Sequence, residues 1–209
     1  MTEPLAPALP AALVLLDYFG IAVFAVSGAL LAAEKRQTLV TFIFFAVATG
    51  VGGGTLRDLL IGAPVFWVST NSMLLICMAA ALAVWFTSRR RFAGQALLWF
   101  DAAGLAAYAT YGAAKALDYG VTPVPAFGMG VLNACAGGII RDVLAGEPSI
   151  LMRPELYVTA AALAAGLLVG LTVAGVPILI AALIAAIAGF TLRGLAIARG
   201  WSIPGYKDS

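Results

Sequence analysis

The sequence predicts an all-α integral membrane protein with seven transmembrane helices, arranged as two inverted three-helix repeats plus a seventh helix. Three observations support this fold class. The 209 residues are 63% hydrophobic and only 11% charged, whereas soluble domains carry about 25% charged residues. The apolar runs are roughly 20 residues long, which is the length that crosses a bilayer core. A glycine-rich segment with an Arg-Asp pair also occurs twice.

Seven spans follow from the apolar runs, at 12–33, 38–61, 71–87, 97–117, 124–146, 155–174 and 176–198. The segments between them are short and hold proline, glycine or charged residues. None is long enough to form a domain outside the membrane. We therefore expect residues 1–209 to form a single membrane domain.

The duplication is visible in the segment GVGGGTLRDLLIG, which begins at Gly50, and in ACAGGIIRDVLAG, which begins at Ala134. The two Arg-Asp pairs lie 84 positions apart, at 57 and 141, and the same shift superposes Asp17 on Asp101. We expect repeat one at 12–87, repeat two at 97–174 and the seventh span at 176–198. Because each repeat has three spans, the second copy enters the membrane upside down. Transporters with inverted repeats carry their central site between the two copies.

Basic residues in the loops predict the orientation. All of them fall on one side of the predicted topology: Lys35, Arg36, Arg89, Arg90, Arg91, Arg153, Arg199 and Lys207. Cytoplasmic loops collect lysine and arginine. The expected location is the cell (inner) membrane as a multi-pass protein, with the N-terminus outside and the C-terminus cytoplasmic.

Composition also argues against several functions. A net charge of +2 without a basic stripe gives no reason to expect nucleic acid as a partner, and the chain contains no histidine, the commonest metal ligand. We expect no metal site, no cofactor and no enzymatic activity. Cys77 and Cys135 occupy non-equivalent positions in apolar segments, which favours buried free thiols over a disulfide.

Glycines form the first candidate site. They are Gly50, Gly52, Gly53 and Gly54 in the second span and Gly137 and Gly138 in the fifth. In one interpretation these small residues let transmembrane helices pack closely. We favour the other, because the glycines recur in both halves and precede charged residues. Glycine costs about 1 kcal/mol relative to alanine inside a helix, so the helices would kink or unwind there and free carbonyl oxygens to coordinate a cation.

Charged residues inside the spans form the second candidate site: Asp17, Arg57, Asp58, Asp101, Lys115, Arg141 and Asp142. A charge at the bilayer centre costs about 2.5–3.5 kcal/mol on insertion scales, so none is expected to face lipid. Neighbours on a helix point about 100° apart, so Arg57 and Asp58 are not expected to pair with each other. Asp17 and Asp101 are the expected partners from other spans. The set either fixes helix packing through ion pairs or lines a hydrated path.

Lys115 breaks the symmetry, because the 84-residue shift superposes it on Leu31. It either extends to the membrane interface or projects into the water path, where it would slow cations. Glu155 and Arg193 are expected at the interface. Without those two, the spans hold four acidic and three basic groups.

On its GGGTLRD and GGIIRD segments, the chain resembles the trimeric intracellular cation channel (TRIC) family, in particular the small seven-span prokaryotic branch, also described as a duplicated glycine-transporter-like domain. The resemblance covers nearly the whole chain, and the PVFW at Pro64–Trp67 and RPELY at Arg153–Tyr157 also fit it. It implies a homotrimer with a pore inside each protomer, lined by the second and fifth spans kinked at their glycines. It also implies permeation by monovalent cations, chiefly K⁺, with Na⁺ as the other candidate.

Two functions stay open from the residues. A passive cation channel fits the inverted repeats, the glycines and the excess of aspartate. The alternative is a secondary transporter of a small solute such as an amino acid, because broken helix ends hold carboxylate and ammonium groups. In either case membrane lipid is an expected partner.

Overall fold

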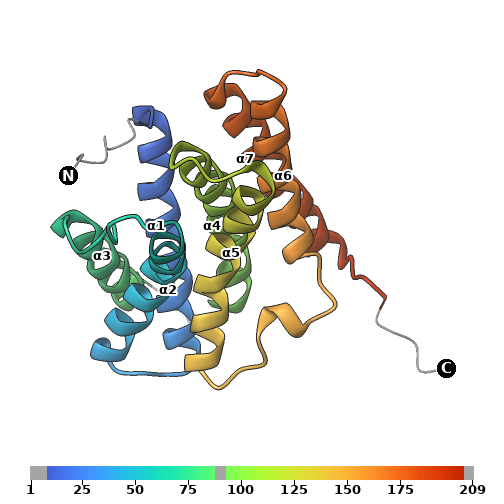
Figure 1. Ribbon diagram of the computed structural model, residues 1–209. Helices are drawn as coiled ribbons and strands as arrows, with labels where there is room; N and C mark the ends of the chain where they lie inside the picture. The colour runs from blue at the N-terminus through green and yellow to red at the C-terminus, as the bar shows by residue number, and fades with distance from the viewer. Residues whose placement is uncertain (1–8, 88–92, 205–209) are drawn as a thin grey trace.

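The computed structural model describes residues 9–87 and 93–204. These residues form seven α-helices and the short 3-10 helix η2 (Figure 1), and the predicted fold class is confirmed. The helices are α1 (Ala11–Glu34), α2 (Leu39–Leu60), α3 (Asn71–Thr87), α4 (Ala93–Asp118), α5 (Pro123–Leu144), α6 (Val158–Val173) and α7 (Ile178–Arg199), and η2 covers Ile150–Met152. Among them α1, α2, α5 and α7 are long and apolar enough to cross a membrane, while α3 and α6 are apolar but shorter.

Local signals account for three of the helix ends. The Thr38 side chain accepts a hydrogen bond from the Thr41 N–H at the start of α2, and Pro123 opens α5, where its missing N–H is tolerated. Gly200 ends α7 with a φ of 66°, the left-handed conformation that favours glycine. The sequence prediction placed the sixth span from 155, but α6 begins at Val158, because Glu155 pairs with Ser202 in an isolated β-bridge and stays outside the helix.

The helices pack as two related groups of three. In the first group α2 and α3 pack on α1, and in the second α5 and α6 pack on α4. The groups meet where α1 contacts α4 and α2 contacts α5. Helix α7 packs against α4 and α6 (Figure 1) and has no counterpart in the first group. The exact repeat bounds of 12–87 and 97–174 stay a prediction.

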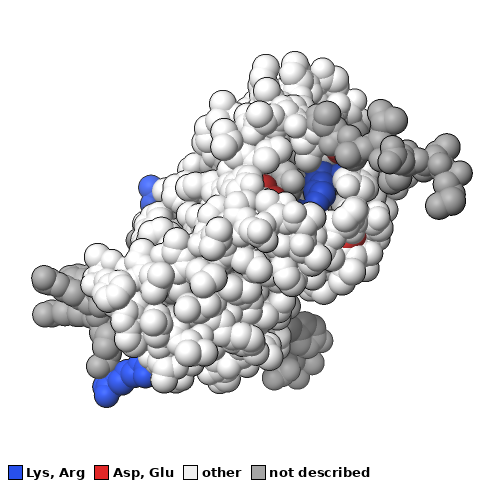
Figure 2. Space-filling model, turned by 90° about the vertical axis from the view of Figure 1, so that its left-hand side faces the viewer, with Lys and Arg blue, Asp and Glu red and all other residues white. Residues whose placement is uncertain are grey.

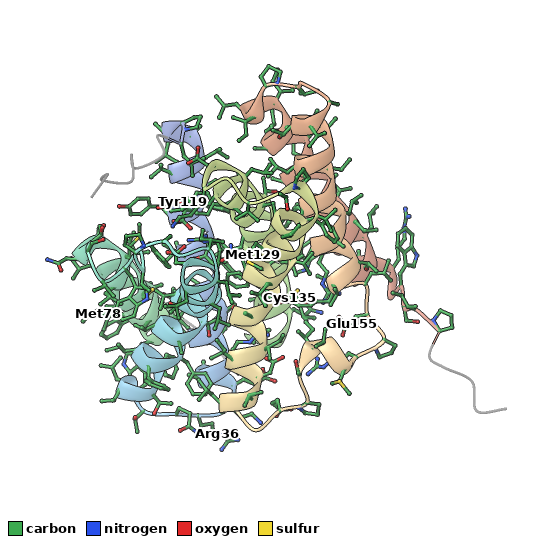
Figure 3. The ribbon with its side chains drawn as sticks, in the orientation of Figure 1. Arg36, Met78, Tyr119, Met129, Cys135 and Glu155 are labelled. Atoms are coloured by element: carbon green, nitrogen blue, oxygen red, sulfur yellow. The ribbon has the colours of Figure 1, made fainter. Side chains whose placement is uncertain are left out.

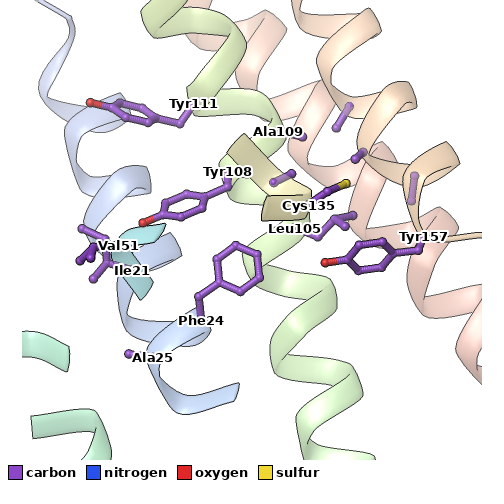
Figure 4. Close-up of a cluster of buried hydrophobic side chains, with 14 of the residues drawn as sticks. Ile21, Phe24, Ala25, Val51, Leu105, Tyr108, Ala109, Tyr111, Cys135 and Tyr157 are labelled. Carbon is purple, nitrogen blue, oxygen red and sulfur yellow. The ribbon is translucent and has the colours of Figure 1, made fainter. Parts of the chain in front are cut away.

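The centre of the bundle carries the symmetry in its side chains. Phe24 on α1 and Tyr108 on α4 are equivalent under the 84-residue shift, and their ring centroids lie 5.1 Å apart (Figure 4). Each ring lies on a glycine of the other helix. A Cβ at Gly104 would be 2.9 Å from the Phe24 ring, and one at Gly20 would be 2.5 Å from the Tyr108 ring. The two repeats therefore make the same contact on each other.

The distribution of polarity is the reverse of that in a soluble protein. Large apolar side chains such as Leu15 and Phe86 are exposed, whereas Arg57, Asp58 and Asp101 are fully buried. On the face drawn in Figure 2, charged side chains are sparse. This is the pattern expected for a protein whose outer surface contacts lipid. Cys77 and Cys135 are free and buried, as the sequence predicted.

Candidate functional site

The glycine-rich segments meet at the contact between α2 and α5. A Cβ at Gly53 would overlap the backbone carbonyl oxygen of Asn133, and one at Gly137 would lie 2.6 Å from the carbonyl oxygen of Thr49. Backbone atoms cannot move aside as the end of a side chain can. Glycine at both positions therefore permits the close approach of the two helices.

The expectation that the glycines unwind these helices is wrong. The backbone is α-helical throughout Leu39–Leu60 and Pro123–Leu144. The physical reason is that packing against the partner helix outweighs the helix-weakening effect of glycine, which is about 1 kcal/mol per residue. The carbonyl groups stay within helical hydrogen bonding and are not freed to coordinate a cation. A kink at Gly50, Gly52, Gly53, Gly54, Gly137 or Gly138 stays a prediction, because a helix can bend without unwinding.

Thr49 and Asn133 also belong to this contact, although the sequence prediction did not include them. They are equivalent under the 84-residue shift, and both are fully buried. Asn133 donates from Nδ2 to the carbonyl oxygen of Tyr108 over 2.8 Å. Thr49 Oγ1 and Asn133 Oδ1 have no hydrogen-bond partner among the described residues. Two polar residues at equivalent positions of an apolar duplication were the signal that could have identified them.

The Arg57 cluster comprises Arg57, Asp58, Lys115 and the nearby Asp17, whose carboxylate interacts electrostatically with the other three. Asp58 Oδ1 accepts from Arg57 Nε and from Lys115 Nζ, each over 2.8 Å. The Arg57 guanidinium lies 5.0 Å from the centre of the Tyr111 ring. The cluster is buried and contains two carboxylates and two basic groups.

The Arg141 cluster comprises Ser27, Asp101, Arg141 and Asp142. Arg141 donates from one terminal nitrogen to Asp101 Oδ1 over 2.6 Å and to Ser27 Oγ over 3.0 Å, and from Nε to Asp142 Oδ1 over 2.9 Å. All four residues are buried. With two carboxylates and one guanidinium, this cluster has an excess of negative charge.

The expectation that adjacent arginine and aspartate residues do not pair is therefore wrong. Of the two partners expected from other spans, one is confirmed and one is not. Arg57 pairs with Asp58, and Arg141 pairs with Asp142. The long arginine side chain curls around the helix and spans the angle between adjacent positions. Asp101 does pair with Arg141. No ion pair joins Asp17 to Arg57 within residues 9–87 and 93–204, and Lys115 occupies the other position on Asp58 Oδ1.

Each aspartate of the Arg-Asp pairs also holds a connecting segment. Asp58 Oδ2 accepts the N–H of Phe66 over 3.1 Å, and Asp142 Oδ2 accepts the N–H of Ile150 over 2.8 Å. Both donors come eight residues after the acceptor and are equivalent under the 84-residue shift. The carboxylate thus folds the chain back at the end of α2 and of α5. Sequence reasoning did not anticipate this role.

Two further charged residues, Lys115 and Arg193, lie inside the bundle. Lys115 is 8% exposed and paired with Asp58, so it does not extend to the interface. Arg193 was expected at the interface but is 1% exposed, and it donates to Glu155 over 2.6 Å. Apolar stretches of α6 and α7 gave no sign of this pairing, because the two residues come from different segments. Arg89, Arg90, Arg91 and Lys207 lie outside the described residues.

A cavity of about 280 Å³ reaches one of the two clusters. Arg141 and Asp142 line it, together with Glu34, Glu147 and Arg153. It therefore opens at the end of the bundle that carries the α1–α2 connection, where Figure 3 labels Arg36. Buried ionised groups thus border a space large enough for several water molecules.

Lys35 and Glu147 form an ion pair beside this cavity, joining the α1–α2 connection to the segment after α5. The hydrogen bond and charge of Lys35 lower the pKa of Glu147 below its ordinary value of 4.5. A lowered pKa means that this pair stabilises the fold above the ordinary pKa, and that the contribution is lost as the pH falls through the folded-state value.

We expect Glu147→Gln to lower the thermal unfolding midpoint slightly at neutral pH, since surface ion pairs contribute little. The difference from the unmodified chain should vanish once the pH is below the lowered pKa. Unfolding scans of both proteins in detergent over a pH series check this. A difference that grows on acidification would contradict it.

In the part of the chain that the structure describes, no three cysteine, aspartate or glutamate side chains group in a way that could hold a metal ion. The polar atoms of the two clusters are engaged mainly with one another and with backbone groups. The site is thus built from ion pairs packed around a helix contact.

Comparison with known sequences gives two matches to one family model. That model, described as "Glycine transporter", matches residues 14–89 and 98–173. The chain is 45% identical over 151 residues to a UPF0126 membrane protein of Vibrio cholerae, and the match covers 71% of this chain and 63% of that protein. It is 41% identical over 148 residues to the UPF0126 inner membrane protein YadS of Escherichia coli, which covers 69% of this chain and 72% of YadS.

Comparison with solved structures agrees with the fold. The structure superposes with a TM-score of 0.87 on the TRIC trimeric intracellular cation channel orthologue from Rhodobacter sphaeroides. Sequence identity is 40%, and the match covers 92% of this chain and 100% of that one. The similarity therefore includes the seventh helix as well as both repeats.

Proposed function

Because the chain belongs to the family of prokaryotic TRIC channels, we propose that it is a monovalent cation channel that conducts K⁺ through a path inside each protomer. The path runs along the α2–α5 contact and joins the Arg57 cluster to the Arg141 cluster. The observation that carries this proposal is the cavity lined by Arg141 and Asp142. It brings solvent to a buried cluster whose excess carboxylate attracts cations.

The glycine contact is the proposed closure of this path. Gly53 and Gly137 lie one helical turn before Arg57 and Arg141, so the contact is between the two clusters along the bundle. Close helix packing at that level leaves little room for a hydrated ion. We propose that α2 and α5 separate there when the channel opens, by bending at the glycines.

Lys115 has a proposed role in the same path. It neutralises Asp58 in the Arg57 cluster, whereas its equivalent, Leu31, leaves the Arg141 cluster with uncompensated carboxylate. A lysine near the path repels cations. We propose that it limits cation flux.

The assembly and orientation follow the same family argument. We propose a homotrimer in the inner membrane, with the N-terminus outside and the C-terminus cytoplasmic. Lys35, Arg36 and Arg153 support this orientation, because all three occur in connections at the end of the bundle where the cavity opens.

Reconstitution of the purified protein in planar bilayers tests the proposed function. We expect discrete single-channel steps in potassium chloride and, under a salt gradient, a reversal potential that moves toward the cation equilibrium potential. Replacing K⁺ by Na⁺ measures selectivity. In the same recordings Lys115→Ala should raise the conductance, whereas Arg199→Ala, which removes an exposed charge at the end of α7, is the matched control.

A solute transporter is the second candidate. The description of the family model names a transporter, and the cavity is lined by both carboxylates and guanidiniums, which suit a zwitterion. Saturable uptake of glycine into proteoliposomes, without current steps, would decide for the transporter and against the channel.

A further inference from the structure

Arg193 is a buried charge that the proposed ion path does not use. It lies on α7, the helix without a counterpart in the first repeat, and is 1% exposed. Its guanidinium donates to Glu155 over 2.6 Å and lies 5.4 Å from the centre of the Tyr157 ring. Burying an arginine costs solvation free energy unless its contacts compensate for the loss. Both contacts are to the short segment that leads into α6.

The segment after α7 holds the same short stretch of chain. The Ile203 N–H donates to the Pro154 carbonyl oxygen over 2.8 Å, and Ser202 forms an isolated β-bridge with Glu155. Figure 3 shows Glu155 in the connection between α5 and α6. Two independent contacts thus tie the seventh helix and the residues beyond it to the start of α6.

Tyr157 carries this connection to the Arg141 cluster. It is 1% exposed. A Cβ at Gly138 would lie 2.7 Å from the Tyr157 hydroxyl and 3.4 Å from Asp101 Oδ1. The hydroxyl therefore borders the Arg141–Asp101 pair, and it has no hydrogen-bond partner among the described residues. In repeat one, Gly54 is covered instead by Phe66, which follows α2 directly, without help from an added helix.

We propose that Arg193 is a positioning residue: it holds Tyr157 against Gly138, so that the seventh helix sets the packing of the Arg141 cluster. Loss of Arg193 leaves Glu155 free to be hydrated, because its side chain is 32% exposed. Replacing Arg193 therefore leaves no buried carboxylate without a partner. The effect on ion conduction rests on the proposed function, whereas the effect on local packing does not.

Cys135 reports on this packing independently of conduction. It lies one turn before Gly138 on α5 and is 5% exposed, and Figure 4 shows it near Tyr157. In a Cys77→Ala background it is the remaining thiol. We expect Arg193→Gln and Arg193→Met to raise the rate of its alkylation by N-ethylmaleimide at least about tenfold, because a buried thiol reacts through local opening of the packing around it. Arg193→Lys should restore part of the protection.

Two controls make the result specific. Arg199→Gln alters an exposed arginine of the same helix that stacks on Trp201, and it should leave the alkylation rate unchanged. Cys77, in a Cys135→Ala background, reports on repeat one and should stay protected in Arg193→Gln. The proposal is overturned if Cys135 stays protected in both Arg193 variants, or if Cys77 loses protection equally. Absence of current from the unmodified protein would refute only the proposed channel.

Discussion

Gly53→Ala is expected to destabilise the fold strongly, even though it adds a single methyl group. That methyl group would overlap the Asn133 carbonyl oxygen, so α2 and α5 have to move apart. Overpacking of this kind costs about 1–3 kcal/mol in the free energy of unfolding, and sometimes more. Gly137→Ala acts on the equivalent contact with Thr49. Chemical unfolding of the purified protein in detergent measures the change.

Gly128→Ala is the matched control for this prediction. Gly128 lies on α5, and a Cβ there meets nothing within 4 Å. Replacing a helical glycine by alanine without a clash stabilises by roughly 0.5–1 kcal/mol. The two variants should therefore have effects of opposite sign. Equal effects would mean that the glycines influence only helix propensity and that the α2–α5 contact contributes little.

Arg141→Gln is the second variant with a large expected effect. It leaves Asp101 fully buried without its ion-pair partner. Removing one member of a buried pair costs about 3–5 kcal/mol. Arg57→Gln should cost less, because Asp58 keeps Lys115 and the Phe66 N–H as partners. The free energies of unfolding of the two variants, measured under one condition, test this order.

Lys35→Gln serves as the exposed comparison. Its pair with Glu147 is reached by solvent on both sides, so its loss should cost a small fraction of what Arg141→Gln costs. An Arg141→Gln protein that is as stable as Lys35→Gln would show that the Arg141 cluster does not hold the helices together. The order Arg141, Arg57, Lys35 is thus the expected ranking of destabilisation.

The sequence was sufficient for the fold class. Apolar runs of about 20 residues locate helices because the bilayer sets their length, and the 84-residue shift of the Arg-Asp pairs located the two repeats. That Asp101 pairs with an arginine of another span also followed, because a buried guanidinium needs a carboxylate as its partner. These inferences depend on the spacing of residues along the chain and on the free-energy cost of burying a charge. Both can be judged from one sequence.

Contacts between segments that are far apart in the sequence could not be predicted in the same way. Whether Gly53 unwinds a helix or packs against Asn133 depends on how closely another helix approaches. The low helix propensity of glycine alone does not predict that distance. Arg57 reaches its neighbour Asp58 because its side chain is long and flexible. The angle of about 100° between adjacent helix positions takes no account of that length. Arg193 looked interfacial because it lies near a helix end, but Glu155 and Tyr157, which follow Pro154, contact its guanidinium.

The mutual packing of Phe24 and Tyr108 on glycines of the opposite helix has a historical consequence. Such a contact is self-complementary, as in a symmetric dimer of identical subunits. A single three-helix polypeptide, inserted in both directions, could have made it with a second molecule of itself.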